Sequence, residues 1–296
     1  MLRWTALLWL LASGPVVAQD AGPQAPAAQA SDKSQPSKTD PATVEPEVTV
    51  EARRAVERKS INRYVNEITV RTDGQIARFH DPICPAVVGL PNKYADVVRR
   101  RIIAVAQKVG LTIDAKPSCH ANFLLVVSTD MTGFIHDART HWPGWFGGMD
   151  TADIDRLERS TAVARAWSAT SVRDERGQDV GYGGVLTTHT ASLITELTAQ
   201  YIDASFVILD RDATYGLTLT QLADYAVMRG LAQTQVPTTD AGIGTILGLF
   251  EKAGDSHPRE LTRTDLTYLQ ALYKEKGYVK GVLERNRLAA ELARQR

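Results

Sequence analysis

Apolar residues recur every third or fourth position between residues 92 and 109, which predicts an amphipathic helix. Gly110 follows as a C-terminal cap signal, and the apolar run at residues 122–128 then predicts a buried strand. The expected helical stripe consists of Tyr94, Val97, Val98, Ile102, Val105 and Val109. Because the consecutive arginines Arg99–Arg101 cannot share one helix face, we expect them to be solvated, with the stem of Arg101 along apolar neighbours.

A second helix is predicted over residues 218–232, directly after a buried strand at residues 202–210. Thr218 and Gln221 have the spacing of a capping box, in which each side chain bonds a free backbone N–H of the other residue. The expected buried stripe consists of Leu219, Leu222, Ala223, Ala226 and Leu231. Replacing Leu222 by Ala should therefore cost ~2–5 kcal/mol. Asp224 has no ligand partner at helical spacing, so its replacement should cost little.

A short apolar turn at residues 245–250 leads to a further helix, which starts with a box-like pair at Thr262 and Asp265. We expect that helix to bury Leu266, Leu269 and either Leu272 or Tyr273. The charged helix after it, to residue 296, should be largely exposed.

The remaining patterns are shorter. Two short strands are predicted around a turn at Asp73–Gly74, a helix at residues 151–159, and a hairpin turning at Arg176–Gly177. Residues 192–200 fit either a helix or a polar connector. Together the elements predict an α+β fold, a mixed sheet with packed helices.

The N-terminal segment has the pattern of a secretory signal peptide. Arg3 precedes an apolar run that is shorter than the ~20 residues of a membrane span, and Val16 and Ala18 form a cleavage pattern. We therefore expect cleavage after Ala18, a periplasmic or secreted protein, and no transmembrane segment in the mature chain. Residues 19–47, rich in Ala, Pro and Ser, predict a disordered linker, and residues 48–296 a single domain.

Cys84 and Cys119 are the 2 cysteines of the chain, which predicts one disulfide in an exported protein. The segment after the first helix is long enough to retrace it, so both cysteines should lie at the same end of that helix. Redox-active pairs are usually two residues apart, which disfavours a catalytic thiol pair. Closing this loop should contribute ~3–4 kcal/mol.

The segment from Asp130 to Asp150 shows neither helical nor strand periodicity and is predicted to be a loop. Its aromatic and histidine residues are Phe134, His136, His141, Trp142, Trp145 and Phe146. They form either a recognition loop for a ligand or partner, or a cover whose rings pack on the core. The packing interpretation is favoured because large aromatic side chains bury wherever they can.

The charge balance and the missing motifs argue against several classes of function. The chain has 34 basic and 34 acidic residues, so nothing favours nucleic acid as a partner. None of the 6 histidines is paired at i, i+4, so no metal site and no cofactor is predicted unless distant histidines such as His136, His141 and His189 converge. Serine elbows, phosphate loops and Cys–His pairs are missing as motifs.

Two resemblances add to these patterns. Residues 206–273 resemble the C-terminal part of metzincin-like secreted zinc peptidases, where a strand leads into the metal helix, an apolar turn and a final helix. The helix at 218–232 departs from that family at every metal-binding position, so the resemblance implies a zincin-like layout without peptidase activity. The stretches "DPICPAVVGLP", "VARAW" and "QLADYAVMRGLA" resemble uncharacterised exported proteins of Gram-negative bacteria with no assigned activity.

The combined expectation is a non-catalytic cell-envelope protein that binds a small ligand or a partner protein, through the aromatic segment. The alternative is a hydrolase with a non-local active site. Asp130, His136, Asp137 and His141 would have to converge in one cleft for that alternative.

Overall fold

The four strands of the described chain form one mixed sheet. The computed structural model describes residues 46–181, 195–239, 241–251 and 257–295. Strands β1 (Pro85–Val88), β2 (Phe123–Ser128), β3 (Ala164–Asp174) and β4 (Thr198–Asp210) lie in the order β1-β2-β4-β3. β1, β2 and β4 run parallel, and β3 pairs antiparallel with β4 and forms one edge. The predicted α+β class is confirmed.

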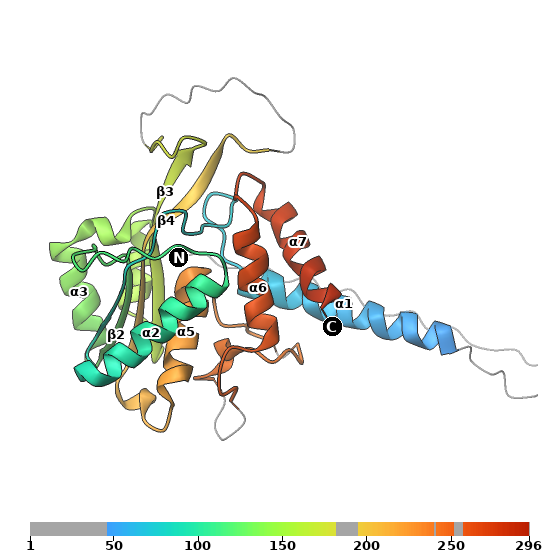
Figure 1. The fold of residues 1–296 in the computed structure, drawn as a ribbon, viewed down its shortest axis with the longest axis horizontal. Helices are drawn as coiled ribbons and strands as arrows, with labels where there is room; N and C mark the ends of the chain where they lie inside the picture. Colours follow the sequence, from blue (N-terminus) through green and yellow to red (C-terminus); the bar gives the residue numbers. More distant parts are fainter. Residues whose placement is uncertain (1–45, 182–194, 240, 252–256, 296) are drawn as a thin grey trace, which may run out of the picture. The chain divides into compact units, whose positions relative to one another are not determined.

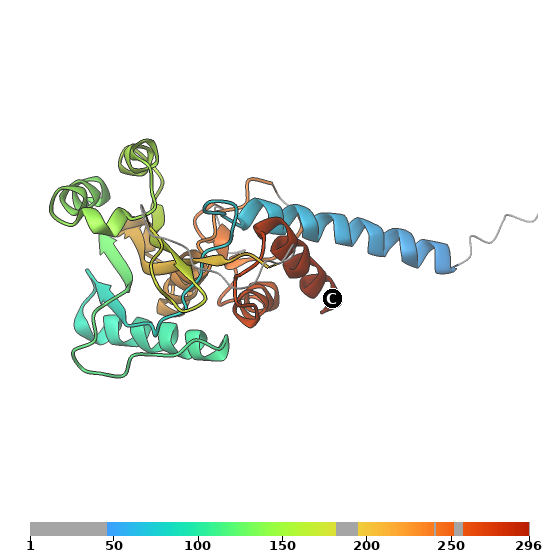
Figure 2. The same ribbon diagram turned by 90° about the horizontal axis from the view of Figure 1, so that it is seen from above.

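Helices cover both faces of the sheet (Figures 1 and 2). Helices α2 (Asn92–Lys108) and α5 (Leu219–Leu231) pack on one face. Helices α3 (Met131–His141) and α4 (Thr151–Glu158), with the short helix η1 (Pro143–Phe146), pack on the other. The predicted order of strand, helix, apolar turn and helix is confirmed by β4, α5, η3 (Ile246–Gly248) and α6 (Arg263–Lys274).

The predicted helix caps are confirmed. Thr218 and Gln221 form a capping box at the start of α5, and Thr262 and Asp265 form one at the start of α6. Gly110 ends α2 with φ +95°, a conformation that favours glycine. The α5 stripe is buried apart from Leu219 at its first turn. In α6, Leu269 and Leu272 are buried as predicted, together with Tyr268, whereas Leu266 is only partly buried.

The prediction of the buried stripe of α2 is only partly correct. Val98, Ile102, Val105 and Ala106 are buried, whereas Tyr94 and Val97 are exposed. Arg99 and Arg100 are exposed as predicted, whereas Arg101 is only partly exposed because its guanidinium pairs with Asp224 of α5.

Helix α1 (Pro46–Ile68) was not predicted, and helix α7 (Gly281–Arg294) is more buried than expected. The apolar residues of α1 fall at helical spacing only in its last two turns, where Ile61, Tyr64, Val65 and Ile68 are buried. Because α7 packs on α1 and α6, Glu284, Leu288, Ala289 and Leu292 are buried as well. The signal peptide and residues 19–45 of the linker lie outside the described residues, and α1 already includes residues 46 and 47.

The two strands expected around Asp73–Gly74 are isolated bridges rather than ladders. Asp73 and Gly74 both have positive φ, so the chain reverses in a tight turn, and Thr72 pairs with Gln75. Beyond the turn, the backbone of Arg78 bonds β4 through the carbonyl of Gln200. Arg173 and Asp179 pair around the predicted turn at Gly177, and residues 182–194 lie outside the described residues.

The Arg78 side chain is buried, with 1% exposure, and it joins α6 to α7. Its Nη1 donates to the carbonyls of Leu272 at 2.6 Å and Glu275 at 2.9 Å, which satisfies free carbonyls at the end of α6. Its Nη2 pairs with the carboxylate of Glu284 in α7, which is also buried. Burial raises the pKa of the Glu284 carboxyl, and Arg78 opposes that rise.

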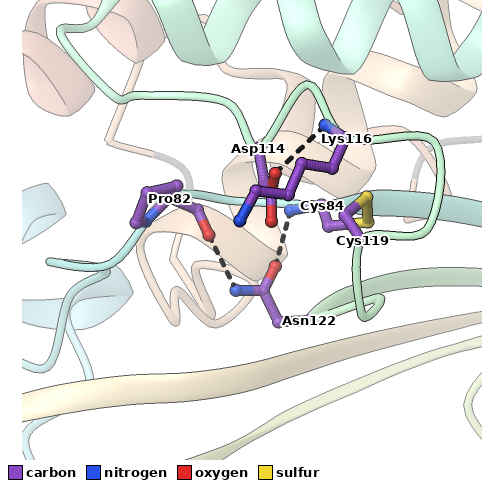
Figure 3. Close-up of a disulfide and its surroundings, with 6 residues drawn as sticks. All are labelled: Pro82, Cys84, Asp114, Lys116, Cys119 and Asn122. Carbon is purple, nitrogen blue, oxygen red and sulfur yellow. Dashed lines mark hydrogen bonds between the residues drawn. A yellow bond between two sulfur atoms is a disulfide. The ribbon is translucent and has the colours of Figure 1, made fainter.

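The predicted disulfide between Cys84 and Cys119 is present, with the two Cα atoms 6.0 Å apart (Figure 3). The side chain of Asn122 holds the chain that leads into Cys84. Its Oδ1 accepts the Cys84 N–H at 2.8 Å, and its Nδ2 donates to the carbonyl of Pro82 at 3.1 Å. Asp114 accepts the backbone N–H of Lys116 and supports the turn before Cys119. No described helix has the length and apolar character needed to cross a membrane.

We predict that Glu284→Ala lowers the free energy of unfolding by ~3–5 kcal/mol, because it leaves the Arg78 guanidinium buried without its counter-charge. Denaturant unfolding followed by circular dichroism measures this. Glu275→Ala is the matched control: its carboxylate pairs with Arg287 at the surface and should contribute below ~1 kcal/mol. Equal losses for the two variants would contradict the central role of Arg78.

Candidate functional site

The aromatic segment from Asp130 to Asp150 is not a loop. Asp130 caps α3 by accepting the N–H of Gly133 at 2.7 Å, and Asp150 caps α4 in the same way. The glycines and Pro143 had obscured the helical period, which is carried by Met131, Ile135 and Ala138, all buried. The loop prediction was therefore wrong. The caps at Asp130 and Asp150 stabilise the starts of two helices whose apolar periodicity is weak.

Most of the aromatic rings pack on the sheet, as the packing interpretation expects. Trp145 stacks on Phe206 of β4 with centroids 4.7 Å apart, and Phe146 stacks on Trp167 of β3 at 5.4 Å. Phe134 is partly buried in the same cluster. Trp142 is 50% exposed and stacks on Trp145 at 5.0 Å, so it is the one of these rings that presents a large surface to solvent.

The polar residues of this segment do not converge on a catalytic centre. His136 Nδ1 contacts the Glu158 carboxylate at 2.9 Å, whereas His141 Nδ1 lies 2.9 Å from the carbonyl of Asp137 in its own helix. The His136 ring, followed by Arg139, holds the pKa of Glu158 below its usual value. No group of three potential metal ligands forms within the described ranges, and His189 lies outside them.

A groove runs along the outer edge of β3. It consists of two adjoining cavities of about 600 and 480 Å³, which share Leu157, Ala166 and Arg229. Residues of α4 and α5 form its two walls, and residues Ala162 to Thr170, most of them in β3, form its floor. The groove exists because α4 and α5 pack on opposite faces of the sheet and nothing in the described chain pairs with β3 between them.

The floor of the groove presents backbone groups without partners. Asp210 N–H donates to the carbonyl of Val163, so odd-numbered residues of β3 bond to β4 and even-numbered residues point outward. The outward groups of Thr170, Val172 and Asp174 are partly satisfied, by the backbone of Gly147, Val180 and Gln178 respectively. Ala164, Ala166 and Ser168 have no backbone partner on this side in the described structure. This edge can therefore accept another strand.

Side chains add polarity to the groove. Ser168 is 2% exposed, and its hydroxyl has no hydrogen-bond partner among the described residues. Arg229 projects from α5 and is held by the carbonyl of Thr234 at 3.0 Å and the hydroxyl of Tyr225 at 2.7 Å. A buried unpaired hydroxyl next to unpaired backbone groups marks a place where a bound molecule would gain hydrogen bonds.

The sequence prediction missed these groove residues. One signal was present: Ala164, Ala166 and Ser168 alternate with larger residues, and small side chains leave an edge strand accessible. The groove itself combines residues 70–73, 148–170 and 225–251, which only the tertiary structure brings together.

Asp224 was expected to be dispensable, and that expectation is wrong. Its carboxylate is buried in α5, accepts two bonds from Arg101 of α2 at 2.7 and 2.8 Å, and accepts the N–H of Leu261 at 2.7 Å. It thus joins α2, α5 and the segment that starts α6. Leu222 is buried, as predicted.

Comparisons with known proteins add no family to this description. No known protein family, curated protein or solved structure matches the chain. The resemblances to metzincin-like peptidases and to exported proteins of Gram-negative bacteria therefore stay predictions.

We predict that Asp224→Ala destabilises the protein by about 3 kcal/mol, because Arg101 and the Leu261 N–H lose their shared acceptor. Denaturant unfolding checks this. Glu260→Ala is the control, since Glu260 contacts the same Arg101 at 3.3 Å but is exposed, and its loss should cost below ~1 kcal/mol. An Asp224→Ala variant as stable as the control would show that the buried pair contributes no net stability.

Proposed function

We propose that this protein is a non-catalytic binding protein of the cell envelope, which holds an extended segment of a partner polypeptide along the free edge of β3. The observation that carries the proposal is the groove whose floor is an unpaired strand edge. Ala164, Ala166 and Ser168 offer donors and acceptors at the spacing of a neighbouring strand. An added strand would satisfy these groups, and its alternate side chains would face the two walls.

The size of the groove agrees with such an occupant. The lining of its floor extends from Ala162 to Thr170, a run of roughly 25–30 Å at the rise of a strand. The walls combine apolar groups such as Leu157 and Phe250 with several charged residues. A compact small ligand would leave much of this run uncovered, whereas an extended peptide follows it.

Export is part of the proposal. It is supported by the signal-peptide pattern at residues 1–18 and agrees with the Cys84–Cys119 disulfide, because disulfides persist in oxidising compartments. We predict that protein recovered from the envelope of the producing cell begins at Gln19, as read by N-terminal sequencing. Recovery of a chain that still begins at Met1 would exclude cleavage after Ala18.

The strand-addition proposal predicts that Ala166→Pro abolishes peptide binding. Proline removes the outward N–H of Ala166 and leaves the β4 ladder intact, because the odd-numbered residues make that ladder. The probe is a displayed library of random peptides, about nine residues long to match the groove. The measurement is enrichment on the wild-type domain and loss of the enriched peptides on the variant.

Ala166→Gly is the matched control, because it keeps the N–H and should keep binding. N-methylation of successive amides in an enriched peptide should weaken binding about three- to tenfold at alternate positions only, since one edge of a strand uses every second residue. Binding that survives Ala166→Pro, or a library that yields no peptide, would refute the proposed function.

A further inference from the structure

Arg229 occupies the middle of the groove, where its two cavities meet. Its guanidinium donates through Nε to the carbonyl of Thr234 and through Nη1 to the Tyr225 hydroxyl. The Tyr225 ring lies beneath it, with the guanidinium carbon 5.6 Å from the ring centroid. These contacts fix the position of the cation, and none of them uses a carboxylate.

The fixed geometry leaves part of the cation unsatisfied. Nη2 of Arg229 makes no hydrogen bond within the described part of the chain, and no carboxylate there pairs with the guanidinium. A guanidinium that is already immobilised loses little side-chain entropy when it binds an anion. Nη2 and the charge are therefore available to a carboxylate that enters the groove.

Charge is distributed unevenly along the groove. The half beside Ala164 is lined by Arg156, Arg165 and Arg229 against one carboxylate, that of Glu251. Arg156 pairs with Asp153 at the boundary of the two halves, and Arg165 donates to the carbonyl of Glu158. The half beside Thr170 shares Arg229 and is lined by Asp73, Asp150 and Asp153, with Arg71 as its other cation. An acidic side chain is thus favoured in the first half and opposed in the second.

We propose that Arg229 is the specificity-determining residue of the groove, and that it selects extended segments with a carboxylate side chain near Ala164–Ala166. The inference rests on the proposed function, since it concerns the same groove, and it adds the chemistry of the partner. The carboxylate pairs with the open side of the Arg229 guanidinium, while the peptide backbone pairs with β3. Because the other half of the groove is acidic, the carboxylate also fixes which way the segment lies.

The test compares the library peptides enriched on the wild-type domain with those enriched on Arg229→Gln, which removes the charge and keeps a hydrogen-bonding side chain. On the wild type, Asp or Glu should dominate one position near one end of the peptides. On Arg229→Gln that preference should disappear. A wild-type peptide should lose affinity on the order of tenfold or more, by fluorescence anisotropy, while its amide analogue with Asn or Gln should bind both proteins equally.

Two further variants make the result specific. Arg229→Lys keeps the charge and should retain part of the acidic preference, and Arg100→Gln, an exposed arginine of α2 outside the groove, should change nothing. Unfolding curves confirm that each variant is folded. This inference would be overturned if the enriched peptides need the Ala166 N–H but show no preference for an acidic residue. It would also be overturned if that preference persists on Arg229→Gln. Strand addition at β3 would stand in both cases. A library without binders would overturn both.

Discussion

The buried guanidinium of Arg78 is the interaction on which the arrangement of the C-terminal half depends. A buried charge is tolerated only when its hydrogen bonds and its counter-charge are supplied. Here the carbonyls at the end of α6 and the Glu284 carboxylate of α7 supply them, while the backbone of Arg78 bonds β4. Arg78 thus joins the sheet, through its backbone, to α6 and α7, and α7 in turn packs on α1.

A second ion pair, with a buried carboxylate, joins elements on the sheet face that carries α2 and α5. Asp224 accepts bonds from Arg101 and from the backbone that leads into α6. Asp265, at the start of α6, is likewise buried and accepts the N–H groups of Ile246 and Thr262. Three buried carboxylates thus add polar contacts between helices that also pack together through the apolar core.

The sequence predicted the elements whose information is local. The caps of α5 and α6, the apolar stripe of α5, strand β2 and the disulfide all follow from spacing over a few residues or from the cysteine count. The sequence did not predict α1 or the burial of α7. Each of these helices is buried partly by the other, and that contact joins residues far apart in the chain. Asp224 was misjudged because its partner is 123 residues away in the chain.

The candidate site was beyond sequence reasoning for a related reason. The groove exists because the outer edge of β3 lacks a neighbouring strand in the described chain. In the sequence, such an unpaired edge is indicated only by the small side chains of Ala164, Ala166 and Ser168. The aromatic segment attracted attention because its composition is unusual, yet its rings mostly form the cluster that supports α4. The unusual aromatic content of residues 130–150 thus reflects packing against the sheet, and the accessible edge of β3 lies next to these residues.

The bond from Thr170 to Gly147 has a consequence for how copies of this chain behave toward one another. An open strand edge invites the edge of an identical molecule, and repeated pairing leads to aggregation. Here Gly147 blocks the edge at one point, and Gln178 and Val180 occupy it further on. The unpaired stretch from Ala164 to Ser168 is therefore short, which limits pairing between the edges of two copies.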